Sequence, residues 1–234
     1  MRQMLHIFNK EFEDFFISPI AYIVISIFLL ITGWLFFTTF FLFNQATLRS
    51  FFDMLPLIFS FVVPAITMRL FSEELNVGSY EILLTLPVTF RDIIIGKFLA
   101  GVALIGAMLV PTLFYPIFIS FLGQLDWGPV AGGYMGTMLI GASFCAVGLF
   151  ASSVTRNQII SFIVGMVICI SLTLIDKMLF FFPEGWLGLI EYLGADHHFQ
   201  NISKGVVDSR DILYFLSVVF IGLYATHFSM REKA

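Results

Sequence analysis

The chain has 234 residues, of which 59% are hydrophobic and only 12% are charged. A soluble domain is about 45 to 50% apolar and about 25% charged, so this composition excludes an ordinary soluble fold, a disordered chain and a secreted disulfide scaffold. The net charge of −4 says little about partners, because in a membrane protein the side that each charge faces matters more, but the lack of a basic patch argues against a nucleic-acid partner.

Residues 1–17 predict an amphipathic helix. At about 100° per residue, Phe8, Phe12 and Phe15 fall on one face, while charged residues such as Lys10 and Glu13 fall on the other. We expect this helix to lie in the membrane interface with its Phe stripe in the acyl boundary. The alternative is that the segment simply begins the first span, but its charges would be costly at the bilayer centre.

Six apolar segments follow that we predict to cross the membrane as helices. They are residues 20–43, 52–71, 98–122, 129–154, 159–182 and 211–228. The second is the weakest, because only 15 uncharged residues separate Asp53 from Arg69 and two of them are proline. The predicted fold class is a single all-α integral membrane domain over residues 1–234, with an interfacial N-terminal helix and a short cytoplasmic coupling helix.

The loop over residues 72–97 carries strong local signals. Gly78 suits a helix stop, and Ser79 suits the N-cap of a short apolar helix over residues 80–86. Thr89 followed by Asp92 predicts a capping box that begins the helix leading into the third span. A short apolar helix outside the bilayer needs a cover, which we expect to be either the membrane surface or another protein.

The loop over residues 183–210 is predicted to carry a helix in or near the outer leaflet, since it contains Trp186 and Tyr192. Its Asp196-His197-His198 run invites a metal hypothesis, but adjacent residues rarely reach one ion, so we predict a structural role and no metal site. Cys145 and Cys169 fall mid-span and are predicted to pack as small apolar side chains.

The positive charges indicate the orientation of the chain. With six spans, eight cations lie on the side of the N-terminus and four, Arg49, Lys177, Lys204 and Arg210, lie on the other. This bias predicts that both termini are cytoplasmic. The first apolar run follows a charged helix and is too long for a signal peptide, so we expect no cleaved leader.

Three stretches of sequence resemble a known family. The first is Ser72-Glu73-Glu74, then Gly78-Ser79-x-Glu81-Ile82-Leu83-Leu84-Thr85-Leu86-Pro87-Val88, then Ile95-Gly96-Lys97-Phe98-Leu99-Ala100. The second runs from Gly148 through Phe162, and the third from His198-Phe199 through Tyr214-Phe215. The first resembles the cytoplasmic loop of ABC-2 type permeases, the membrane subunits of ATP-driven transporters. The other two resemble the gliding-motility-associated branch of these permeases, and the resemblance covers nearly the whole chain in order.

The resemblance implies a bacterial inner-membrane permease that couples ATP hydrolysis by a separate ABC ATPase subunit to translocation of a substrate, in the export direction. It also implies a second permease, as a homodimer or a related chain, in contact with membrane lipids. The residues implied to contact the ATPase are Glu73, Glu74, Gly78, Ser79, Glu81, Leu84, Pro87 and Arg91, with Arg156 as a second cytoplasmic contact. By chemistry alone these carboxylates are equally ordinary solvated groups, and Arg156 equally a lipid contact.

The chain is not expected to be an enzyme. It has no GxxxxGK[ST] motif, so ATP and Mg²⁺ are expected on the partner ATPase and no cofactor on this chain. The spans also lack the convergent polar residues that an intramembrane hydrolase needs. The alternative function is a membrane scaffold, or a force-transmitting anchor of an envelope or motility machine, that binds an ATPase without moving a solute.

Overall fold

The computed structural model describes residues 2–43, 47–78, 89–178 and 187–233. Within these ranges the chain is helical and has no strand. The helices are α1 (Arg2–Ile17), α2 (Ile20–Phe43), α3 (Arg49–Thr67), α4 (Arg69–Val77), α6 (Phe90–Leu109), the 3₁₀ turn η1 (Val110–Leu113), α7 (Phe114–Leu122), α8 (Trp127–Val154), α9 (Gln158–Leu174), α10 (Leu187–Leu193), α11 (Ala195–Ser203) and α12 (Ser209–Arg231).

Among the described residues, five stretches are long and apolar enough to cross a membrane. They are Ile20–Leu42, Arg49–Val77, Phe90–Leu122, Trp127–Val154 and Ser209–Arg231. The predicted span over residues 159–182 corresponds to α9, a shorter apolar helix of 17 residues. The all-helical membrane fold is thus confirmed, while the count of six spans stays a prediction.

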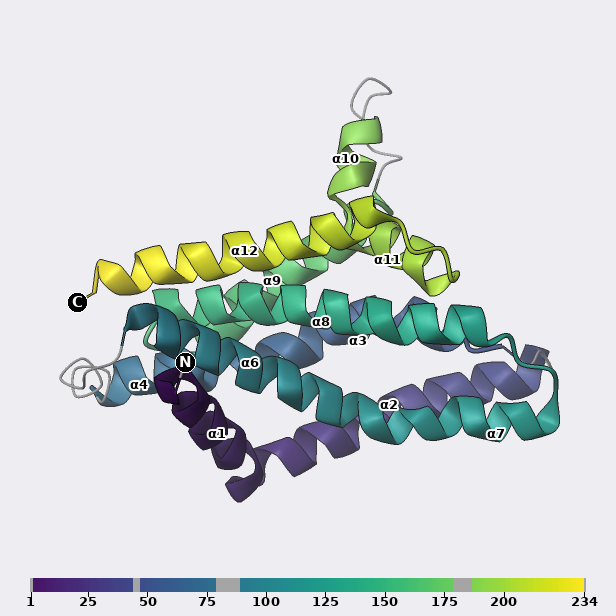
Figure 1. Ribbon diagram of the computed structural model, residues 1–234, viewed down its shortest axis with the longest axis horizontal. Coiled ribbons are helices and arrows are strands. Elements are labelled where there is room, and N and C mark those ends of the chain that lie inside the picture. The colour runs from purple at the N-terminus through teal and green to yellow at the C-terminus, as the bar shows by residue number, and fades with distance from the viewer. Residues whose placement is uncertain (1, 44–46, 79–88, 179–186, 234) are drawn as a thin grey trace.

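Helix α8 forms the centre of the bundle. It packs against α3, α4, α6, α9, α11 and α12, and it is the most buried of the candidate spans. Figure 1 shows it running along the middle of the molecule, between α12 on one side and α6 and α7 on the other. Its many small residues allow this close packing, because glycine, alanine and serine let helix backbones approach one another.

The outer helices α2 and α12 leave most of their apolar side chains uncovered. Phe41 and Leu42 on α2, and Phe220 and Ile221 on α12, are each about two-thirds exposed or more (65%, 73%, 70% and 64%). In a membrane these faces meet acyl chains, which cover apolar side chains as well as protein does. Both chain termini lie at one end of the bundle, and the end of α4 and the start of α6 lie there too (Figure 1).

The local signals around the 72–97 loop are borne out where the structure describes them. Gly78 ends α4 in the left-handed conformation, with φ of 77°. The Thr89 side chain accepts a hydrogen bond from the Asp92 backbone N–H and caps α6. The predicted short helix over residues 80–86 lies outside the described residues.

The N-terminal helix differs from the expectation of a helix resting only on lipid. Phe15 is almost completely buried, and Ile7, Phe8, Phe12 and Phe16 pack against the same apolar cluster, which includes α4 and α6 side chains. The Arg69 guanidinium lies 5.3 Å from the centre of the Phe15 ring. Much of the Phe stripe is therefore covered by protein.

We expect Gly132→Ala to destabilise the protein. A Cβ at Gly132, on α8, would collide with the carbonyl oxygen of Ile202 at the end of α11. Overpacking of this kind costs about 1–3 kcal/mol. The matched control is Gly106→Ala, whose Cβ would meet no atom closer than Met138 Cε at 3.8 Å. Both changes gain the same helix propensity, so an equal effect on the thermal unfolding midpoint in detergent would contradict the prediction.

Candidate coupling site

A buried lysine holds three helices together at the end of the bundle that contains the termini. Lys97 of α6 is only 1% exposed, and its Nζ lies 2.9 Å from Glu11 Oε1 of α1 and 2.7 Å from Glu74 Oε1 of α4. The two carboxylates are themselves largely buried, with 12% and 14% of their side chains exposed. We call Lys97, Glu11 and Glu74 the lysine cluster.

The helix geometry that builds the lysine cluster depends on the residue before Lys97. A Cβ at Gly96 would lie 2.9 Å from Ile7 Cγ2 and 3.1 Å from the Met4 carbonyl oxygen, so α1 crosses α6 at the one residue that leaves room for it. This crossing brings Glu11 beside Lys97. Phe71 of α4 is fully buried and packs against the same lysine, with its ring centre 5.3 Å from Lys97 Nζ.

The charges in the lysine cluster are not balanced. Within the cluster one ammonium faces two carboxylates, and Glu74 Oε2 is buried with no hydrogen-bond partner among the described residues. The exposed Lys10 adds a second cation, with Nζ 3.5 Å from Glu11 Oε1. Burial by itself would raise the pKa of Glu11, but the charges and hydrogen bonds of Lys97 and, to a lesser extent, Lys10 outweigh it and hold this pKa below its ordinary value of 4.5. Glu11 is therefore ionised at neutral pH.

A charged groove of about 510 Å³ opens beside the lysine cluster, between α1 and α4. Seven of its lining residues are ionisable: Lys10, Glu11, Asp14, Arg69, Glu73, Glu74 and Lys97. A groove with both signs of charge and few apolar atoms suits a polar protein surface better than an acyl chain.

The start of α4 is also tied to the centre of the bundle. Ser152 Oγ, from α8, accepts hydrogen bonds from the backbone N–H groups of Phe71 (2.9 Å) and Ser72 (3.0 Å), and donates one to the Met68 carbonyl (2.9 Å). Phe71 and Ser72 lie in the first turn of α4, where backbone N–H groups lack intrahelical partners. One hydroxyl thus joins α8 to the junction of two helices.

The residues predicted from the sequence to contact an ATPase lie at different places in the structure. Glu73 is exposed on α4, while the neighbouring Glu74 points inward to Lys97. Arg91 lines a different and mostly apolar groove between α6 and α12. Arg156 is exposed in the turn between α8 and α9. Ser79, Glu81, Leu84 and Pro87 lie outside the described residues.

Lys97, Glu11 and Ser152 were not singled out as functional from the sequence. A lysine next to a glycine at the edge of an apolar span was a usable signal for Lys97, because an isolated cation at that depth needs a partner. No pattern identified the partner, since Glu11 is 86 residues away along the chain. Ser152 looked like any other small residue of α8.

His198 of the outer loop joins three helices. His198 is buried, with Nδ1 2.6 Å from Asp211 Oδ1 and Nε2 2.9 Å from the Tyr192 carbonyl oxygen. Its ring also stacks on Tyr214, with centroids 4.1 Å apart. Both ring nitrogens are engaged in joining α10, α11 and α12.

Two comparisons bear on the identity of the chain. A family model described as ABC-2 family transporter protein matches residues 5–185. The match includes every residue of the lysine cluster and of the Ser152 junction. No curated protein sequence matches the chain.

Replacement of Lys97 by methionine is expected to lower the free energy of unfolding by about 3–5 kcal/mol, because two carboxylates would stay buried without a counter-charge. The triple variant Lys97→Met, Glu11→Gln and Glu74→Gln removes those charges and should recover most of the loss. Equilibrium unfolding in detergent measures both. A single variant as stable as the wild type would show that the pairing does not form.

The lowered pKa of Glu11 predicts a dependence of stability on pH. The ionised Glu11 stabilises the fold fully above its ordinary pKa of 4.5, and this contribution is lost as the pH falls through the lower pKa of the folded state. Below pH 4.5 the unfolding midpoint of the wild type should therefore fall more steeply than that of Glu11→Gln. Glu13→Gln, at an exposed position on the same helix, serves as the control and should follow the wild type.

Proposed function

The chain belongs to the ABC-2 family of transporter proteins, whose members are permease components of ABC transporters, and we propose that α4 and the loop after it receive the movement of a partner ATPase. In this proposal Glu73, exposed at the rim of the charged groove, contacts the ATPase. Glu74 faces inward and passes the movement on to Lys97. The two adjacent carboxylates thus have separate roles.

The observation that carries this proposal is the attachment of α4 to its neighbours. The lysine cluster links α4 to α1 and α6, and Ser152 links the start of α4 to α8. Separating a buried charge pair, or a buried hydroxyl from its partners, costs free energy. Each group would then stay out of water without the hydrogen bond or opposite charge that offsets its desolvation. A displacement of α4 therefore moves the ends of several helices together.

The energy for such a displacement would come from ATP binding on the partner. ATP shifts the permease between two states only as far as the ATPase binds one of them more tightly than the other. A tightly connected α4 increases this difference in affinity. The reason is that a shift of α4 is costly unless α1, α6 and α8 shift with it. In this proposal ATP and Mg²⁺ bind to the ATPase, and the lack of a GxxxxGK[ST] motif in this sequence supports that assignment.

The orientation that fits this proposal has both termini in the cytoplasm of a bacterium and the permease in its inner membrane. Both termini lie at the same end as α4, and the eight-to-four distribution of cations favours that end as cytoplasmic. We further propose a pair of permeases with a pair of ATPases, export as the direction, and membership of the gliding-motility-associated branch. The resemblance of the sequence supports these three points.

The test of the proposal is co-expression of the chain with the ABC ATPase encoded nearest to it. Glu73→Lys should weaken co-purification about tenfold and reduce stimulated ATP hydrolysis, because it reverses a charge at the contact surface. Glu232→Lys, an exposed carboxylate at the same end of the molecule, is the matched control. Unchanged association and turnover of Glu73→Lys would contradict the contact.

The triple variant of the lysine cluster separates docking from transmission. Its changed side chains are largely buried, so it should still bind the ATPase while the stimulation of ATP hydrolysis by the permease is lost. ATP-dependent movement of a cargo in reconstituted vesicles distinguishes a transporter from a scaffold. An assembled complex that hydrolyses ATP and never moves a cargo favours the scaffold.

A further inference from the structure

A second cavity, of about 450 Å³, lies at the end of the bundle opposite the termini. We propose that it binds the phosphate head group of an anionic phospholipid, with Arg49 and Lys204 as its cationic contacts. The site involves no part of the lysine cluster, and it stands whether or not an ATPase docks on α4. We call it the head-group pocket.

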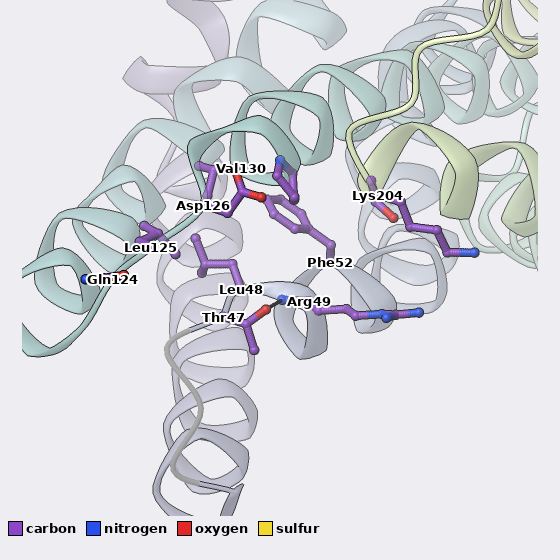
Figure 2. A pocket seen from close by; sticks show the side chains of 11 residues that line it. Thr47, Leu48, Arg49, Phe52, Gln124, Leu125, Asp126, Val130 and Lys204 are labelled. Atoms are coloured by element: carbon purple, nitrogen blue, oxygen red, sulfur yellow. Dashed lines mark hydrogen bonds between the residues drawn. The ribbon is translucent and has the colours of Figure 1, made fainter.

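The two cations of the head-group pocket are available for a ligand. Arg49 is the first residue of α3 and Lys204 follows α11, and both line the cavity. In the described residues neither side chain has a hydrogen bond or an ion pair. Figure 2 shows Arg49 and Lys204 extending toward the same side of the pocket.

The one carboxylate in the lining lies away from these cations. Asp126, the one carboxylate in the wall, accepts a hydrogen bond from the Gly128 backbone N–H at 3.0 Å, and it lies on the far side of Phe52 from the two cations (Figure 2). Thr47 Oγ1 accepts from the Arg49 backbone N–H at 3.1 Å. The lining therefore carries a net charge of +1, from two cations and one carboxylate.

Five apolar residues line the cavity beside the cations, which favours a lipid over a free anion. They are Leu48, Phe52, Leu125, Pro129 and Val130, and the polar residues Thr47, Gln124 and Ser203 complete the lining. A site for inorganic phosphate alone would be expected to surround the anion with donors. Cations beside an apolar wall match a ligand whose phosphate adjoins hydrocarbon.

The position of the pocket along the bundle supports the same ligand. Arg49 and Trp127 are the first residues of two candidate spans, so the cavity lies at the level where spans end and head groups begin. An arginine and a lysine at the head-group level can each contact a lipid phosphate, and the planar guanidinium can donate two parallel hydrogen bonds to it.

Close packing of α11 on α8 holds Lys204 in place. Gly205, with φ of 86°, lies so near the start of α8 that a Cβ would be 3.2 Å from both Gly128 C and Pro129 N. The Gly205 backbone N–H also donates to the Ile202 carbonyl at 2.9 Å. The backbone that carries Lys204 is thus anchored to the wall that carries Asp126 and Val130.

The test is calorimetric titration of the full chain, in an uncharged detergent, with dihexanoyl phosphatidylglycerol, dihexanoyl phosphatidylcholine and inorganic phosphate. We expect saturable binding of phosphatidylglycerol that Arg49→Gln and Lys204→Gln each weaken and that the double variant weakens at least tenfold. Arg210→Gln, which removes an exposed cation at the same end outside the pocket, is the matched control and should bind like the wild type.

Three results would overturn the proposal. Equal binding of phosphatidylcholine would show that the anionic charge is not recognised. Equal binding of inorganic phosphate would show that the apolar wall contributes nothing. Unchanged binding by the double variant, with a thermal unfolding midpoint like that of the wild type, would show that the lipid binds elsewhere.

Discussion

The arrangement of this protein depends on one buried positive charge. Lys97 lies almost fully inside the bundle, where an unpaired ammonium would be too costly to keep, so the fold must bring carboxylates to it. It takes one from the N-terminal helix and one from α4. The need to pair one lysine therefore fixes how the N-terminal helix, the end of the second candidate span and the third span meet.

The same requirement explains why small residues occur where they do. Gly96 permits α1 to cross α6 next to the lysine, and the small side chains of α8 let α3, α11 and α12 approach the bundle axis. Ser152 adds a hydroxyl at the first turn of α4, where backbone N–H groups lack intrahelical partners. Close helix packing and the pairing of scarce polar groups are thus two parts of one constraint, because polar groups can pair in an apolar interior only where backbones come near.

The two ends of the bundle use their charges in different ways. At the end with the termini, Lys97 and the carboxylates pair with one another and join helices, which suits transmission of a movement. At the opposite end Arg49 and Lys204 have no partner among the described residues and border an apolar wall, which suits a ligand from outside the chain. A paired charge stabilises the fold, whereas an unpaired charge at the membrane surface attracts lipid.

The sequence by itself determined the membrane class, the approximate positions of the spans and the helix ends at Gly78 and Thr89, because each depends on a run or spacing of neighbouring residues. It also directed attention to the segment around Glu73 and Glu74, but it could not tell the exposed carboxylate from the buried one. Only the tertiary structure decided that Glu74 and Glu11 share Lys97, across 23 and 86 residues of chain. The physical reason is that a salt bridge depends on which helix faces meet, and that is set by packing of the whole bundle.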